Sequence, residues 1–236
     1  MRARLPLFAL VVGASLLGCG GHGRPASGEA AGSYLPLVEG ARWRYAISTQ
    51  LGGIEIEVTG RGERELSTAG RRIFLMDERN LGPSLGFDKV APVGYVVEQG
   101  YVARIEGIGY DREGGLRELG QDTATRVLPI DPKPGDRWEQ SNRLFTTPEG
   151  GGAGLSWSAD ITTRTKITVP AGAFADVIEV VTTYYDDDSP TIDPTPKVVY
   201  RDYYARGVGL VKSVTEDPSG DLSNRVEQLL VDYSFP

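Results

Sequence analysis

The chain has 236 residues with one histidine, His22, and one cysteine, Cys19, and its formal net charge at pH 7 is −7. An acidic protein repels nucleic acid and anionic lipid surfaces, so we do not expect nucleic-acid partners. Both His22 and Cys19 precede the folded body that we expect. The sequence therefore excludes Ser-His-Asp catalysis, Cys-His catalysis and zinc sites built from His or Cys in that body.

Residues 1–18 have the pattern of a cleavable signal peptide. Arg2 and Arg4 form a positive start, and the apolar stretch that follows, 5–17, is too short to span a bilayer as a stable helix. The stretch Leu16-Leu17-Gly18-Cys19 resembles the lipobox of bacterial lipoproteins, in which the cysteine becomes the lipidated first residue of the mature chain. The sequence therefore predicts lipidation of Cys19, and loss of the two arginines would change the formal charge to −9.

Residues 19–33 contain the lipidated cysteine and then only small or polar residues, which predicts a flexible tether. No later stretch has the length of apolar sequence that a transmembrane helix requires. We expect the body to be attached to a membrane of the cell envelope without lying in it. In a host with two membranes, Gly20 in place of Asp resembles lipoproteins sorted to the outer membrane, where the body would face the periplasm.

Residues 34–236 are predicted to form a mainly all-β domain. The chain contains 31 glycines, and its prolines are scattered, as in proteins with many short strands and tight turns. From Leu155 to Val169 the residues alternate, with Trp157 and Ile161 on the expected inner face and Asp160 on the outer face. Shorter runs of this kind are Arg42 to Thr49, Ile54 to Thr59, Arg72 to Glu78, Tyr95 to Glu98, Tyr101 to Glu106, Val177 to Tyr185, Val198 to Tyr204 and Leu210 to Val214.

Turn residues separate several of these runs. Gln99-Gly100 predicts a hairpin, and Asp217-Pro218-Ser219-Gly220 predicts a turn before the segment Arg225 to Phe235. That last segment also fits a helical stripe, but the tight turn before it favours a strand. A weak helix candidate lies at Gly115 to Thr123.

Two phrases in the chain resemble each other: Tyr34-Leu-Pro-Leu with Gly40-Ala-Arg-Trp43, and Val127-Leu-Pro-Ile with Gly135-Asp-Arg-Trp138. In each phrase the Leu-Pro pair favours extended backbone, the glycine supplies a turn, and the tryptophan begins an inward-facing strand position. One interpretation is a duplicated β-unit with halves 34–125 and 127–236, and the other is coincidence. In both, Trp43 and Trp138 are expected to be core residues.

With two further motifs, Val169-Pro-Ala-Gly-Ala-Phe174 and Tyr204-Ala-Arg-Gly-Val-Gly-Leu-Val-Lys212, these phrases resemble a family of uncharacterised bacterial secreted and lipid-anchored β-proteins. The resemblance spans nearly the whole mature chain. It implies a curved antiparallel sheet or half-barrel, loosely similar to envelope carriers of the LolA type, and brings no known catalytic residues with it. The glycines and prolines of the last two motifs are expected to act through backbone geometry.

No phosphate-binding loop occurs, and no pair of glutamates is singled out for glycoside hydrolysis. The acidic stretch with Asp186, Asp188 and Asp193 offers weak candidates for a calcium site, but it lacks EF-hand spacing and is better read as a solvated loop. We therefore expect no metal, no cofactor and no catalytic residues. The protein is predicted not to be an enzyme.

Tyrosines gather on two runs that we expect to be neighbouring strands. Because adjacent residues of a strand point to opposite faces, both faces of this hairpin should carry rings, one in the core and the other either in a binding face or in cross-strand packing. The possible binding-face residues are Tyr184, Tyr185, Tyr200, Tyr203 and Tyr204.

Two functions remain open. The first is a binding or carrier module whose curved sheet holds an apolar ligand, which requires that Trp43, Trp138 and Trp157 do not fill the inner face. The second is an envelope scaffold or protein-interaction domain that has no small-molecule ligand and uses an edge strand or the tyrosine-rich face.

Overall fold

The structure is a computed structural model, and it describes residues 32–50, 52–66, 71–82, 90–105, 108–110, 114–118, 124–143, 154–164, 166–186, 196–219 and 225–236. Within these ranges the chain forms sixteen β-strands. They are β1 (Arg42–Thr49), β2 (Gly52–Leu66), β3 (Arg71–Asn80), β4 (Ala91–Glu98), β5 (Tyr101–Ile105), β6 (Ile108–Tyr110), β7 (Leu116–Glu118), β8 (Ala124–Pro129), β9 (Arg137–Arg143), β10 (Gly154–Arg164), β11 (Ile167–Val169), β12 (Gly172–Phe174), β13 (Val177–Asp186), β14 (Pro196–Ala205), β15 (Gly209–Glu216) and β16 (Val226–Ser234). The described residues contain no helix that is long and apolar enough to cross a membrane.

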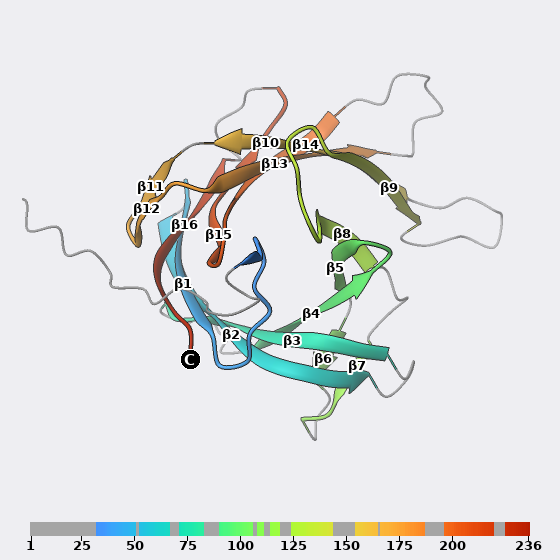
Figure 1. The fold of residues 1–236 in the computed structure, drawn as a ribbon, viewed down its shortest axis with the longest axis vertical. Helices are drawn as coiled ribbons and strands as arrows, with labels where there is room; N and C mark the ends of the chain where they lie inside the picture. Colours follow the sequence, from blue (N-terminus) through green and yellow to red (C-terminus); the bar gives the residue numbers. More distant parts are fainter. Residues whose placement is uncertain are drawn as a thin grey trace, which may run out of the picture.

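Twelve of the described strands form one antiparallel sheet in the order β8-β5-β4-β3-β2-β1-β16-β15-β14-β13-β10-β9. The sheet curls into an almost closed barrel (Figure 1), with β1 paired to β16 and an unsealed seam between its two edge strands, β8 and β9. The predicted fold class, an all-β protein with a curved antiparallel sheet, is confirmed. The curvature goes further than a half-barrel, because the two edges of the sheet face each other.

The alternation predicted for the segment after Leu155 is confirmed in β10. Trp157 and Ile161 are buried, and Asp160 between them is exposed. The predicted run is divided, however: β10 ends at Arg164, and the last three residues form β11 of a small separate hairpin with β12. The turn at 170–171 therefore joins the two short strands β11 and β12.

Two hairpins cover the outer face of the barrel (Figure 1). The β6–β7 hairpin brings Ile108 against Ile73 and Ile105, and Gly94 permits this approach, since a Cβ there would lie 2.9 Å from Ile73 Cδ1. The β11–β12 hairpin packs on β16, where the Phe174 and Tyr233 rings lie 6.0 Å apart. Apolar residues of both faces of the sheet are thereby buried, which stabilises the barrel wall.

The predicted turns and the C-terminal strand are also found. Gln99 and Gly100 both have positive φ, 50° and 83°, as a two-residue hairpin turn between β4 and β5 requires. The segment Arg225 to Phe235 contains strand β16, and it is not a helix. In the weak helix candidate, the described residues 116–118 are strand β7.

The repeated phrase forms the same turn twice. Gly40 N–H donates to Gly60 O, Gly60 N–H donates to Ala41 O, and Ala41 N–H donates to Val38 O. The second copy has the three corresponding bonds: Gly135 N–H to Ile161 O, Ile161 N–H to Asp136 O, and Asp136 N–H to Lys133 O. Gly40 and Gly135 have φ of 81° and 90°, which glycine adopts without strain. Each phrase therefore starts a strand in the same way, while duplication of the complete halves stays a prediction.

The segment Ser33 to Leu37 crosses one end of the barrel, here called the closed end (Figure 1). Tyr34 is buried, its hydroxyl donates to Asp176, and Arg206 Nε donates to the same carboxylate at 2.6 Å. The hydrogen bond from Tyr34, with help from Arg206, lowers the pKa of Asp176. This clamp holds the segment that precedes β1 against the turn between β14 and β15.

Candidate functional site

Two cavities lie inside the barrel and share part of their walls. One, the floor cavity, has a volume of about 170 Å³. The other, the upper cavity, has a volume of about 470 Å³, within the range of small-molecule sites in proteins. The residues that line both cavities, here called the waist, are Tyr95, Arg104, Tyr204, Leu210 and Gln228.

The apolar part of the floor cavity is lined by Trp43, Ile56, Val58, Met76 and Val93, with Leu35 of the segment that crosses the closed end. Trp43 donates its indole N–H to Val208 O at 2.6 Å, and Tyr45 donates its hydroxyl to Leu210 O at 3.0 Å. Because these polar atoms are satisfied by the backbone, the rings present mainly apolar surface to the cavity.

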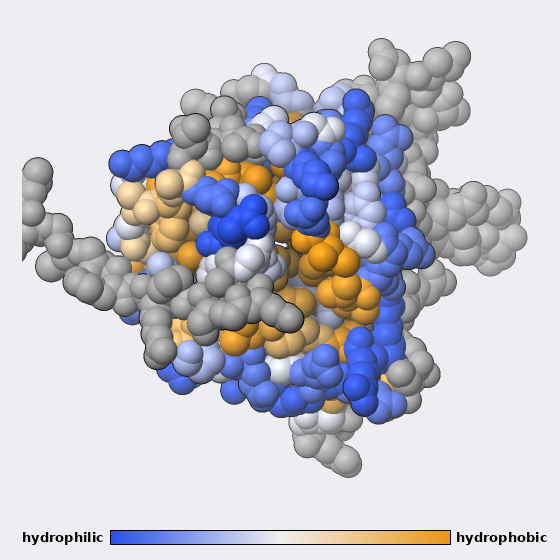
Figure 2. All heavy atoms as spheres, viewed as in Figure 1, coloured by the Kyte–Doolittle hydropathy of each residue, from blue (hydrophilic) through white to orange (hydrophobic). Residues whose placement is uncertain are grey.

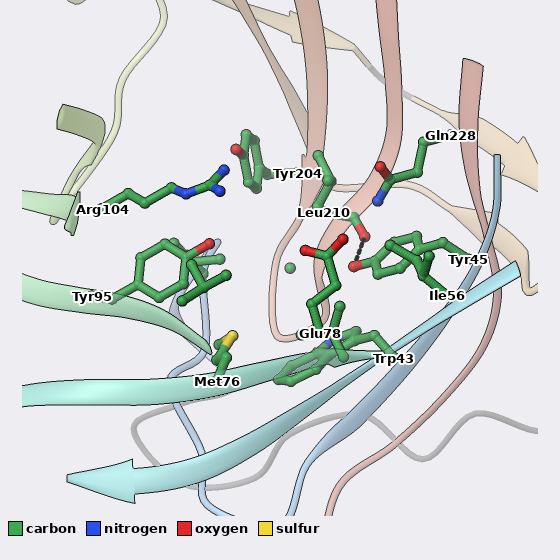
Figure 3. Close-up of a pocket in the computed structure, with 14 residues that line it drawn as sticks. Trp43, Tyr45, Ile56, Met76, Glu78, Tyr95, Arg104, Tyr204, Leu210 and Gln228 are labelled. Atoms are coloured by element: carbon green, nitrogen blue, oxygen red, sulfur yellow. Dashed lines mark hydrogen bonds between the residues drawn. The ribbon is translucent and has the colours of Figure 1, made fainter. Parts of the chain in front are cut away.

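The waist places polar groups above this floor. In Figure 3 the Arg104 guanidinium, the Tyr95 hydroxyl and the Gln228 amide point towards the cavity, and the Glu78 carboxylate rises from β3 between them. Burial raises the pKa values of Tyr45 and Tyr204 above that of a free phenol, so both hydroxyls stay protonated well beyond physiological pH. A ligand at this level would meet one cation, one carboxylate and several neutral hydrogen-bonding groups.

Asp202 lies on the wall of the upper cavity. Burial raises its pKa to about 6, although the Ser213 hydroxyl and the Arg104 charge both act to lower it. Ser213 is directly opposite Asp202 on β15. A carboxyl with this pKa changes charge in the mildly acidic range, so the charge of the upper cavity depends on pH.

Aromatic rings form a continuous row on the wall of the upper cavity. The Trp157 and Tyr184 rings stack with centroids 5.6 Å apart, and the Tyr184 and Tyr200 rings meet edge to face at 5.3 Å. Because Trp157, Tyr184 and Tyr200 come from the adjacent strands β10, β13 and β14, the row runs across the sheet. The Trp157 indole N–H is the one buried side-chain polar atom without a hydrogen-bond partner among the described residues.

The five predicted tyrosines divide between the two faces of the sheet. Tyr184, Tyr200 and Tyr204 line the upper cavity. Tyr203 instead donates its hydroxyl to Glu179 at 2.7 Å on the opposite face, and Tyr185 lines a surface groove with Ser156 and Ser158. Whether the inward tyrosines bind a ligand stays a prediction.

The other predicted site residues are the lipidation site and the acidic stretch. Cys19, Asp188 and Asp193 lie outside the described residues, as does the side chain of Asp186 at the end of β13. Among the residues that the structure does describe, no group of three or more His, Cys, Asp or Glu side chains could hold a metal ion.

Sequence reasoning did not find Glu78, Arg104, Asp202 or Gln228 as lumen residues. A signal was present, because Asp202 occupies an even position in β14 between Tyr200 and Tyr204, in the row that faces inward. A charge in the inward row of an alternating strand is therefore the pattern that could have located this site.

No protein-family model matches the chain, and no curated protein matches it. Two solved structures resemble its fold. One is a candidate lipoprotein from Parabacteroides distasonis, with 12% identity, a TM-score of 0.48, and coverage of 85% of this chain and 98% of the other. The second is a candidate exported protein with a YmcC-like fold from Bacteroides fragilis, with 11% identity, a TM-score of 0.42, and coverage of 86% and 99%. At these scores the likeness concerns the course of the chain alone, and the functional proposal below is based on the cavities.

Proposed function

We propose that this chain is a non-catalytic, lipid-anchored binding or carrier module of the bacterial cell envelope, which holds a ligand with an apolar part inside its barrel. The observation that carries the proposal is the pair of adjacent cavities in the lumen, which share five lining residues. A barrel that served only as a scaffold would gain stability by filling this space, because empty volume in a core costs free energy.

The three tryptophans leave the lumen open. All three are at most 5% exposed, and Trp43 and Trp157 lie in the cavity walls without blocking them. The floor cavity is slightly larger than the roughly 150 Å³ apolar cavity that suffices to bind benzene in an engineered protein. The polar waist above it favours an amphipathic ligand, whose apolar part lies in the lumen while its polar group reaches Arg104 and Gln228.

The membrane location that we propose for the protein is based on the sequence. Residues 1–18 as a signal peptide, lipidation of Cys19, and the outer membrane facing the periplasm in a host with two membranes are all proposed on that basis. Replacement of Cys19 by Ser should release the protein from the membrane fraction into the soluble fraction, which fractionation of the expressing cells would measure.

The alternative is an envelope scaffold that binds a protein partner. It has less support, because three of the five tyrosines that could have formed an exposed platform face the lumen. It would gain support if the lumen proved unable to take up any small molecule.

A matched pair of variants tests the proposal. Thr182 lines the upper cavity and Thr183 follows it on the other face of β13, so Thr182→Trp should fill the lumen while Thr183→Trp should leave it open. The probe is 11-(dansylamino)undecanoic acid, whose fluorescence increases in an apolar site. We expect saturable binding to the parent chain and to Thr183→Trp, and loss of binding in Thr182→Trp with an unchanged circular dichroism spectrum. Equal binding by both variants, or none by the parent chain, would contradict the proposal.

A further inference from the structure

The closed end of the barrel carries an apolar groove with a volume of about 420 Å³. Its walls come from the segment Ser33 to Leu37 and from the neighbouring strands, and include Val97, Val102, Leu128 and Ile130. Leu35 lies in the wall of this groove and of the floor cavity, so the crossing segment separates the groove from the lumen.

Two side chains at this groove have unusual exposure. Val97 is 57% exposed and Ile130 is 55% exposed, the highest values for large hydrophobic residues in the described part of the chain. Val97 lies near the end of β4, and Ile130 directly follows β8. The Ile130 N–H donates to Gly100 O, in the turn after β4, at 2.9 Å. Figure 2 looks onto this end and shows hydrophobic residues gathered near its centre, with hydrophilic residues around them. Such patches on a protein surface commonly contact a partner or a membrane.

The chain enters the barrel at the same end. Arg206 Nη1 donates to Gly32 O at 2.8 Å, and Gly207 N–H donates to Ser33 O at 2.7 Å, so the first described residues are fixed beside the groove. Residues 20–31 separate Gly32 from Cys19. A flexible coil of that length spans about 20 Å on average, so an anchor at Cys19 would keep this end close to the bilayer.

Local charge does not oppose contact with neutral lipids, although the chain as a whole is acidic. Lys133 Nζ pairs with Asp131 at 3.2 Å next to Ile130, and the Arg126 guanidinium lies 4.8 Å from the centre of the Tyr101 ring. The loop after Ile130 and the neighbouring strand β8 therefore carry cations as well as an anion. A zwitterionic lipid surface suits this mixed rim better than a strongly anionic one.

We propose that the closed end rests on the surface of the anchoring bilayer, with Val97 and Ile130 inserted among the lipid headgroups. This proposal goes beyond ligand binding and rests on the proposed lipid anchor at Cys19. It orients the molecule: the end of the lumen that is lined by Trp157, Tyr184 and Tyr200 faces away from the bilayer. Ligand exchange would then occur on the aqueous side of the membrane.

The test uses the full lipidated chain in vesicles of phosphatidylcholine and phosphatidylethanolamine. Cys19 is the only cysteine, so once it is acylated a single new cysteine can be labelled selectively with the environment-sensitive dye NBD. The labelled variants are Val97→Cys and Ile130→Cys, and the control is Thr49→Cys, an exposed position where β1 ends at the opposite end of the barrel. All three positions are exposed, and unchanged thermal unfolding would confirm that each variant folds.

We expect blue-shifted NBD emission and strong quenching by doxyl-labelled lipids at positions 97 and 130, and neither effect at position 49. Labels at 97 and 130 that stay as water-exposed as the label at 49 would overturn the proposal. A blue shift that is already complete without vesicles would also overturn it, because a second copy of the chain would then cover the patch. The mass of the N-terminal peptide reports acylation of Cys19 separately, so failure of the anchor is distinguishable from failure of the orientation.

Discussion

The barrel has two junctions between its N-terminal and C-terminal halves, and they are closed by different means. At the first, β1 pairs with β16 through a backbone ladder from Arg42↔Ser234 to Ser48↔Glu227. At the second, β8 and β9 have no backbone ladder among the described residues. Gln140 of β9 instead accepts from Arg126 N–H at 3.0 Å and donates to Ala124 O at 2.5 Å, and Trp138 donates to Arg126 O at 3.4 Å.

The difference shows how a side-chain amide can substitute for a peptide group. Gln140 uses its amide oxygen as an acceptor and its amide nitrogen as a donor, and these are the groups that a neighbouring strand would present to β8. These bonds give hydrogen-bond partners to backbone groups at the edge of β8. The backbones of β8 and β9 themselves are not paired in a ladder. The strands of the seam therefore stay apart beside the upper cavity, whose wall includes Thr125 and Arg126 of β8.

The largest expected effect concerns the equivalent turns that begin β1 and β9. Gly60 and Ile161 make corresponding hydrogen bonds, but a Cβ on Gly60 would lie 2.2 Å from Val38 O, directly after the crossing segment. We expect Gly60→Ala to lower the free energy of unfolding by about 3 kcal/mol or more, since backbone must move. Urea unfolding would measure the loss.

Gly32→Ala is the matched control, because nothing lies within 4 Å of a Cβ there. A Gly60→Ala variant as stable as Gly32→Ala would show that the two turns do not differ in the way described.

The second prediction concerns the side-chain hydrogen bonds across the seam between β8 and β9. Gln140→Ala should lower the free energy of unfolding by about 2 kcal/mol, because two backbone groups of β8 lose their partners. It should also speed hydrogen exchange at the Arg126 amide. The neighbouring exposed residue gives the control, Glu139→Ala, for which we expect little change. Unchanged exchange at Arg126 in Gln140→Ala would mean that the seam is held by other contacts.

The third prediction concerns the contact of the two halves across the lumen, where Arg104 of β5 acts on Asp202 of β14. Burial raises the pKa of Asp202 to about 6, so the folded state binds a proton more tightly than the unfolded state. The stabilising contribution of this group is complete below about pH 4 and is lost as the pH rises through 6. Asp202→Asn should remove this dependence and increase stability at pH 7 by about 1 kcal/mol, the side chain being partly open to the cavity.

Thermal unfolding of both proteins between pH 4 and pH 8 would measure this effect. Parallel stability curves for Asp202→Asn and the parent chain over that range would contradict the raised pKa.

The smallest expected effect is the difference in stability between replacing Trp43 and replacing Trp138, the tryptophans of the two repeated phrases. Trp43 donates to Val208 O at 2.6 Å, whereas Trp138 donates to Arg126 O across the seam at 3.4 Å. Both replacements by Phe remove similar volume, so the difference between them reports mainly the hydrogen bonds. We expect Trp43→Phe to be the more destabilising by about 0.5–1 kcal/mol in chemical unfolding. The reverse order would indicate that the seam bond is the stronger.

Local patterns made much of the fold predictable from the sequence. Alternation around Trp157 and Ile161 predicted a half-buried strand, and Gln99-Gly100 predicted a hairpin, because both depend on neighbouring residues only. The position of Arg104 in the lumen depends on the pairing of β5 with β4 and β8, partners that local alternation does not identify. The seam depends in the same way on Gln140 meeting the β8 backbone, and no short-range pattern encodes that meeting.

The direct test of a ligand-holding lumen is native mass spectrometry of the Cys19→Ser chain, purified from a bacterial host without detergent and measured before and after organic extraction. We expect an added mass that disappears on extraction and is absent from the Thr182→Trp variant. The bare polypeptide mass before extraction, or an added mass that Thr182→Trp retains in full, would contradict it.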